Sequence, residues 1–151
     1  MALQSILLLL AVLVIGTVQG YVAYNITPVY RGSKYMVSKN AEPFDLAQMN
    51  GRCRGSGGYL LQLDSFREYI YLKSELSRIR DHSLVYTGIT DLGSEGHFYN
   101  YNDKKPAAYL KWRRHQPDNW AGKEHCVNLS YYGLNDIDCR GTARYICEIP
   151  V

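Results

Sequence analysis

Hydrophobic and polar positions divide the chain into an uncharged apolar leader and a series of short amphipathic elements. Residues 1–20 carry no charged side chain, and their apolar run at 6–15 is short for a bilayer span. Gly20 is a small residue ahead of a plausible cleavage point before Tyr21. The pattern predicts a secretory signal peptide and an exported, soluble mature chain. An uncleaved membrane anchor is the alternative, but neither a basic flank nor a longer apolar run supports it.

The first helical pattern covers residues 42–54. Leu46, Met49 and Cys53 recur there at intervals of three and four. Pro43 suits the first turn of a helix because it needs no N–H partner. The glycines that follow are expected to end this helix.

The second helical pattern begins with Ser-Phe-Arg-Glu at 65–68, which is a capping box. It predicts a helix that runs to about Arg78. We expect Phe66, Ile70 and Leu76 to contact the core.

Strand patterns alternate with turn residues around these two helices. The expected strands lie at 30–37, 59–63, 84–89, 126–129, 134–139 and 143–148. Residues 90–119 are rich in Asp, Asn, Gly, Lys and Pro and predict a long, functional loop region. Helices first and strands last indicate an α+β domain. We assign a short segment at 21–28 and one domain at 29–151, without repeats or a linker.

Cysteine usage agrees with export. All four cysteines follow the leader, and an even count in an exported chain predicts two disulfides, with three pairings possible. A four-cysteine zinc site is the weaker alternative because no C-x-x-C pair is present. The formal net charge of +3 is too small to indicate nucleic-acid binding.

Side-chain oxygens concentrate in two short segments near the C-terminus. Three carboxylates and two amides stand close together in sequence: Gln116, Asp118, Glu124, Asn135 and Asp136. Carboxylate and amide oxygens are the ligands that a hard cation prefers, and Ca²⁺ takes about six to eight of them. This set predicts a calcium site with coordination positions left open.

Several of these motifs together resemble the signature of the C-type lectin domain, over about residues 30–148. The matching motifs are Gln116-Pro117-Asp118, Glu124 with Cys126, Asn135-Asp136, Gly88-Ile89-Thr90-Asp91, Glu95-Gly96-His97-Phe98 and Tyr145-Ile146-Cys147-Glu148. The small size is similar to that of secreted insect lectins. The resemblance implies a double-loop α+β fold closed by disulfides Cys53–Cys147 and Cys126–Cys139. It also implies one Ca²⁺ held by the five oxygen-bearing residues, with Pro117 in the cis form.

The order of amide and acid in the Gln116-Pro117-Asp118 motif implies the class of sugar that we expect the protein to bind. In the family this resembles, Glu-Pro-Asn accompanies mannose and Gln-Pro-Asp accompanies galactose, so Gln116 and Asp118 imply terminal galactose or N-acetylgalactosamine. Two sugar hydroxyls would complete the ion's shell, and Trp120 would pack on the C–H face of the ring. The loop from Trp120 to Glu124 is shorter than in vertebrate galactose receptors, which implies looser selectivity over mannose.

An auxiliary calcium site is a further implication of the resemblance. Asp91 and Glu95 match two of its ligands, but Asn119 and His125 stand where relatives carry acids. Solvated loop acids are an equal alternative for Asp91 and Glu95. Trp112 is expected in the core.

The expected role is sugar binding without catalysis, because disulfides would consume the thiols and the crowded oxygens suit a metal. Microbial or cell-surface glycans are the expected partners, in innate immune recognition or agglutination, with avidity from a possible homodimer. The alternatives are a protein partner, or an anionic glycan or lipopolysaccharide held by Arg113 and Arg114. Asn25 and Asn128 begin N-glycosylation sequons; the second is expected to lie in a strand.

Overall fold

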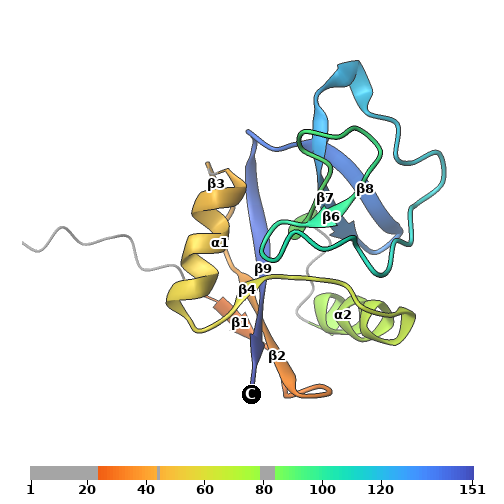
Figure 1. Ribbon diagram of the computed structural model, residues 1–151. Coiled ribbons are helices and arrows are strands. Elements are labelled where there is room, and N and C mark those ends of the chain that lie inside the picture. The colour runs from red at the N-terminus through yellow and green to blue at the C-terminus, as the bar shows by residue number, and fades with distance from the viewer. Residues whose placement is uncertain (1–23, 44, 79–83) are drawn as a thin grey trace, which may run out of the picture.

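The computed structural model in Figure 1 describes residues 24–43, 45–78 and 84–151. The elements follow in the order β1 (Tyr24–Ile26), β2 (Ser33–Ser38), β3 (Glu42–Pro43), α1 (Leu46–Gly55), β4 (Tyr59–Leu60), α2 (Phe66–Arg78), β5 (Val85–Thr90), β6 (Tyr99–Asn100), the 3₁₀ helix η1 (Trp120–Gly122), β7 (Glu124–Ser130), β8 (Gly133–Asp138) and β9 (Thr142–Pro150). The α+β prediction is confirmed. The predicted signal peptide at 1–20 lies outside the described residues and stays a prediction.

One sheet organises the domain, with strand order β1-β2-β9-β5-β7-β8. The last strand, β9, pairs antiparallel with β2 and parallel with β5, so it joins the N-terminal strands to the loop-bearing half. Figure 1 shows α1 on one side of β9 and the β7–β8 hairpin on the other. Because β1 pairs with β2, the sheet extends into the segment that the sequence assigned before the domain.

The first helix begins later than predicted. Pro43 lies in strand β3, which pairs with β9, and not in a first helical turn. The helix begins at Leu46 after Asp45, whose carboxylate accepts the N–H of Gln48 at 2.9 Å. This N-cap supplies the acceptor that the first turn needs, which fixes the start there. Leu46 and Met49 are buried as predicted.

The second helix presents a different face to the core from the one predicted. Phe66 and Ile70 are 56% and 44% exposed, so their assignment to the core is wrong. The buried side chains are Tyr69, Leu72 and Leu76, which share a face at spacings of three and four. Leu76 is the one predicted contact that is confirmed.

The capping box of α2 is confirmed in part. The Ser65 hydroxyl accepts the N–H of Glu68 at 3.3 Å. Glu68 does not return the bond to Ser65: its carboxylate accepts the N–H of Asp64 at 2.7 Å and the hydroxyl of Tyr35 at 2.6 Å. The glutamate therefore ties the start of α2 to β2.

A second buried carboxylate, Glu148 on β9, lies near Glu68. The hydroxyl of Ser33 donates to Glu148 at 2.9 Å. Burial raises the pKa of both glutamates; for Glu148 it reaches about 7, and the charge of Glu68 adds to the effect. The sheet therefore encloses a pair of carboxyl groups that resist ionisation.

Two of the six strand predictions need correction and four are confirmed. The predicted strand at 30–37 begins at Ser33, because Arg31 and Gly32 turn the chain with φ of 50° and 87°. Of residues 59–63 only the first two pair as a strand, although the remainder is buried. The predicted strand at 84–89 is present as β5, and the three C-terminal strands are also present. Of these three, β7 and β9 are longer than predicted, whereas β8 has the predicted length and begins one residue earlier.

The two disulfides are those that the family resemblance implied. Cys53–Cys147 ties α1 to β9, and Cys126–Cys139 ties β7 to the end of β8. All four cysteines are thereby paired, which excludes the zinc interpretation. Within 24–43, 45–78 and 84–151, no helix is long and apolar enough to cross a membrane.

Candidate metal and ligand site

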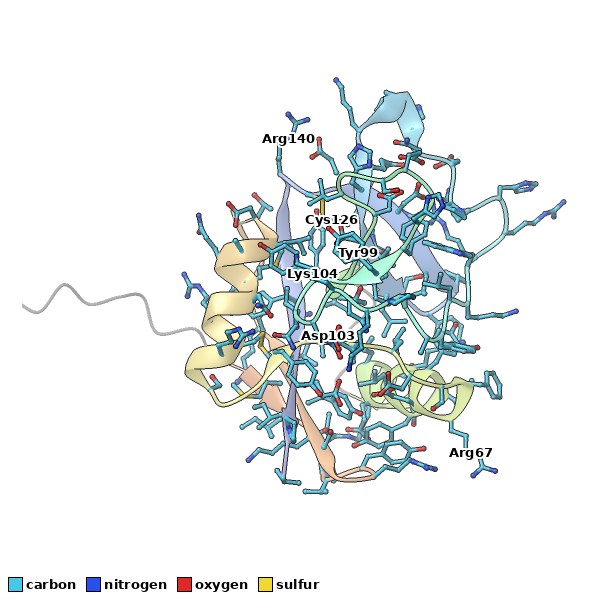
Figure 2. All side chains as sticks on the ribbon, viewed as in Figure 1. Arg67, Tyr99, Asp103, Lys104, Cys126 and Arg140 are labelled. Carbon is cyan, nitrogen blue, oxygen red and sulfur yellow. A yellow bond between two sulfur atoms is a disulfide. The ribbon has the colours of Figure 1, made fainter. Side chains whose placement is uncertain are left out.

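The expected site forms where the loop ending at η1 runs into the β7–β8 hairpin. In this hairpin Asp136 pairs with Val127, and the Cys126–Cys139 disulfide holds the adjacent strand ends together. The Gln116–Pro117 peptide is cis, as predicted. In Figure 2, side-chain oxygens gather above the labelled Cys126.

Three carboxylates meet at this point. One oxygen each from Asp118, Glu124 and Asp136 lie within 4.8 Å of one another. Burial raises the pKa of Glu124, the charges of Asp136 and Asp118 raise it further, and the N–H of Trp120 acts in the opposite direction. Three negative groups at such short range form an arrangement that a divalent cation would stabilise.

The two amides next to these acids have oxygens without donors. The Gln116 Oε1 and Asn135 Oδ1 atoms are buried, and neither has a hydrogen-bond partner among the described residues. Asn135 donates its NH₂ to the carbonyl of Asp136 at 2.8 Å, which leaves its oxygen to accept. Buried acceptors are nearly always satisfied, so these orphaned oxygens fit a cation as the missing partner.

A short hydrogen-bond chain shapes the loop around the acids. Asp136, which is 1% exposed, accepts the N–H of Asp118 at 3.2 Å and of Asn119 at 2.6 Å. The Asn119 side chain accepts the N–H of Glu124 at 3.1 Å, and Glu124 accepts the N–H of Trp120 at 2.9 Å. Backbone N–H groups of the loop thus place the carboxylates of Asp136 and Glu124.

Asn119 is a site residue that the sequence analysis did not assign to this cluster. Its backbone has φ of 41°, in the left-handed region. Asn is among the few residues with side chains that adopt this conformation readily. An Asn directly after the acid of the Gln-Pro-Asp motif was the signal that could have identified it.

The two tryptophans differ in solvent exposure, as the sequence predicted. Trp120 is 72% exposed on η1, which excludes the alternative of a core tryptophan. Trp112 is half-buried against the main core, with its ring 4.8 Å from that of Phe98. The site therefore has one aromatic ring in solvent directly beside the carboxylates.

A second cluster combines Asp91, Glu95 and His125. The His125 Nδ1 atom lies 3.2 Å from an Asp91 oxygen and 3.4 Å from a Glu95 oxygen. Asp91 is 1% exposed, so it is not the solvated loop acid of the alternative interpretation, whereas Glu95 is 55% exposed. An imidazole occupies the place of an oxygen ligand, and Asn119 is engaged with the first cluster, so this donor set does not fit calcium.

The sequons lie on different strands. Asn25 is in β1. Asn128 is in β7 with a fully buried side chain. The folded domain has no room for a glycan at Asn128, which corrects the assignment of that residue as a glycosylation site.

Comparison with known proteins agrees with this geometry. The family model described as "Lectin C-type domain" matches residues 42–149. C-type lectin 37Da of Drosophila melanogaster is 33% identical over 109 residues, which are 65% of this chain and 59% of that protein. Salivary C-type lectin 2 of Aedes albopictus is 38% identical over 71 residues, 42% of this chain and 47% of that protein. This chain therefore spans about half the length of the two relatives.

Solved structures show the same fold. The carbohydrate-recognition domain of the mouse scavenger receptor C-type lectin superposes with a TM-score of 0.71 at 26% identity. The superposition covers 82% of this chain and 92% of that domain. Together with the family model and the two disulfides, these findings show that the chain belongs to the C-type lectin family, which is generally a carbohydrate-binding, non-enzymatic family.

Proposed function

We propose that this protein is a secreted, calcium-dependent lectin that binds terminal galactose or N-acetylgalactosamine. The observation that carries the proposal is the pair of orphaned amide oxygens beside three converging carboxylates. The residues that would hold the ion are Gln116, Asp118, Glu124, Asn135 and Asp136. When bound, calcium would supply coordination positions for two neighbouring sugar hydroxyls.

The protein's own side chains orient the sugar. A carboxylate only accepts hydrogen bonds, whereas an amide can also donate through its NH₂. Gln116 therefore offers a donor where Asp118 offers an acceptor, and an exchange of the two would reverse this polarity. The Gln-Pro-Asp order is the one that accompanies galactose in the family.

Trp120 supports the same sugar class. Its exposed ring is the kind of surface on which the C–H face of galactose packs. The backbone N–H of Trp120 donates to the Glu124 carboxylate, so the residue that carries the ring is held next to the proposed metal ligands. Binding of one sugar should be weak in an open site, and clustered glycans or a homodimer would supply avidity.

Secretion and biological role belong to the same proposal. The uncharged leader and two disulfides support export. One relative is named as a salivary lectin. Recognition or agglutination of microbial or host cells through surface galactose is the role that these features favour.

Retention on galactose–agarose tests the proposal. The protein should bind in millimolar calcium, elute with free galactose and not with mannose, and pass through the column in excess chelator. Retention that persists in chelator would refute the calcium mechanism.

A double variant tests the sugar assignment separately. Gln116→Glu combined with Asp118→Asn keeps the net charge and the number of oxygens, so calcium affinity should stay within about tenfold. Its preference should move from galactose to mannose. A variant that binds calcium and still prefers galactose would show that the motif does not set the sugar class.

A further inference from the structure

A groove lies at the turn of the β7–β8 hairpin, at the opposite end of β7 from the three converging carboxylates of the proposed calcium site. It encloses about 420 Å³ and is lined by Leu84, Arg113, Ser130, Tyr131 and Tyr132. The six steps from one end of β7 to the other span about 20 Å. The groove is therefore a separate feature from the site at Glu124.

Its walls are unusually apolar and aromatic for exposed surface. Tyr132 is 79% exposed, Tyr131 is 55% exposed and Leu84 is 46% exposed. The two tyrosine rings meet edge to face with centroids 5.4 Å apart, and the ammonium of Lys73 lies 4.5 Å from the Tyr131 ring. These contacts brace the Tyr131 ring, whereas Tyr132 remains mostly in solvent.

The backbone fixes Arg113 against this hairpin. Its N–H donates to the carbonyl of Leu134 at 2.9 Å, and the N–H of Leu134 donates to the carbonyl of Lys111 at 2.8 Å. Gly133 has φ of 130°, and a Cβ there would lie 2.7 Å from the Arg113 nitrogen. The close approach allowed by this glycine places the arginine beside the tyrosines.

The groove carries one charged side chain among its described lining residues, which is that of Arg113. Arg113 is exposed. Its guanidinium has no hydrogen bond or ion pair within the described parts of the chain. The hydroxyl of Ser130 is already engaged, because it donates to the carbonyl of Gly133 at 2.8 Å and accepts the N–H of Tyr132 at 3.2 Å.

We propose that this groove is a second, calcium-independent glycan site that takes a carboxylated pyranose. The guanidinium of Arg113 would form a paired hydrogen bond with the sugar carboxylate, a geometry for which its planar fork is suited. The Tyr132 ring would pack on a C–H face of the same sugar. A neutral hexose has no carboxylate to pair with the guanidinium, so it would lose this charge-assisted contact.

Saturation-transfer NMR in excess chelator tests the proposal, since chelation removes the calcium-dependent site. The ligands are 3′-sialyllactose, an unsulfated chondroitin disaccharide and lactose. At least one acidic ligand should receive saturation, and lactose should not. Sialyllactose alone would identify a sialic acid site, and the disaccharide alone a uronic acid site. Equal transfer to lactose, or none to either acidic ligand, would overturn the proposal.

Matched arginine variants locate the binding. Arg113→Gln should weaken acidic-ligand binding about tenfold or more, the loss expected for a charge-assisted pair. Arg114→Gln removes a neighbouring exposed arginine that does not line the groove, and it should leave binding unchanged. Tyr132→Ala should weaken binding without altering the fold, because that side chain is mostly in solvent. Equal effects of the two arginine variants would contradict the assignment.

Sedimentation checks the other occupant of such a groove, a second copy of this chain. The parent and Tyr132→Ala proteins should sediment alike over a range of concentrations. A dimer that Tyr132→Ala dissociates would show that the groove is a contact between copies, and would overturn the proposal. Galactose binding in calcium is measured in parallel, so that failure of either site is seen separately.

Discussion

The buried carboxyl of Glu148 should give the domain a pH-dependent stability that one substitution removes. This side chain is 6% exposed, and its Oε2 atom has no hydrogen-bond partner in the described structure. Burial, and then the charge of Glu68, raise its pKa from 4.5 to about 7. Between these values the folded protein binds more protons than the unfolded chain. The free energy of unfolding therefore falls as the pH rises through this range.

The magnitude follows from the size of this shift. About 2.5 pH units at about 1.4 kcal/mol each give about 3.5 kcal/mol. Because the carboxyl of the unfolded chain is already partly ionised at pH 4, roughly 3 kcal/mol of this stability is present at pH 4 and lost at pH 8. Glu148→Gln keeps the volume and a carbonyl for the Ser33 hydroxyl but cannot ionise. The free energy of unfolding of the variant, minus that of the parent, should therefore be about 3 kcal/mol higher at pH 8 than at pH 4.

Urea unfolding of both proteins at pH 4, 6 and 8 measures this difference. Chelator keeps divalent ions from contributing at any carboxylate. Glu95→Gln is the control, because that carboxylate is 55% exposed and the loss of its ion pair with His125 should change stability by at most about 1 kcal/mol at each pH. A Glu148→Gln effect that is the same at pH 4 and pH 8 would refute the argument that Glu148 is held neutral by burial.

Three further predictions concern the proposed ligand site and the sequons. Trp120→Ala should weaken galactose binding about three- to tenfold while calcium binding stays unchanged, as calorimetry with each ligand would show. Asp136→Asn should lower calcium affinity at least about a hundredfold, because the carboxylate both contributes charge and accepts the N–H groups of Asp118 and Asn119; retention of calcium affinity would remove Asp136 from the site. Mass spectrometry of the exported protein should find a glycan on Asn25 alone, and occupancy of the second sequon would contradict the burial seen in β7.

Much of the candidate site could be predicted because its residues lie in two short segments of the sequence. Three of the five oxygen donors fall between Gln116 and Glu124, and the other two are adjacent. A hairpin and one disulfide are enough to bring such segments together. Asn119 was harder to identify, because its role depends on a left-handed backbone that composition does not reveal.

The incorrect predictions share a different physical cause, which is competition from distant partners. Pro43 suits a helix locally, but the chain at that point pairs with β9, about a hundred residues later. Phe66 and Ile70 are apolar and helical, yet the sheet meets α2 on the face of Leu72 and Leu76. Local periodicity identifies the helix, whereas the sheet decides which side is buried.

The groove was beyond sequence reasoning for a similar reason. Its walls come from three segments, around Leu84, Arg113 and Tyr131–Tyr132. Singly exposed aromatic residues are common, so neither tyrosine indicates a site alone. Only the pairing of residues 111–113 with β8 shows that two aromatic rings share one surface with a guanidinium that has no partner in the described part of the chain.

Mild acid should have opposite effects on the carboxylates of the proposed calcium site and on the buried carboxyl of Glu148. It should weaken calcium binding but stabilise the fold, so that the protein releases sugar while it stays folded. Protons compete with calcium for Asp118, Glu124 and Asp136, and loss of the ion removes its stabilisation. At ten times the Kd that stabilisation is about 1.4 kcal/mol, which is less than the roughly 3 kcal/mol gained as Glu148 takes up its proton.

The proposed site should therefore lose its calcium in mild acid, with the near-ultraviolet circular dichroism of the domain retained. Binding to galactose–agarose should return when the pH is restored to neutral. In Glu148→Gln the acid-induced gain in stability is absent. The urea midpoint of this variant, measured relative to that of the parent, should therefore be lower at pH 4.5 than at pH 8. If the circular dichroism signal is lost at the same pH as binding, acid unfolds the domain. The stability lost with the metal ion would then exceed the stability gained by protonation of Glu148.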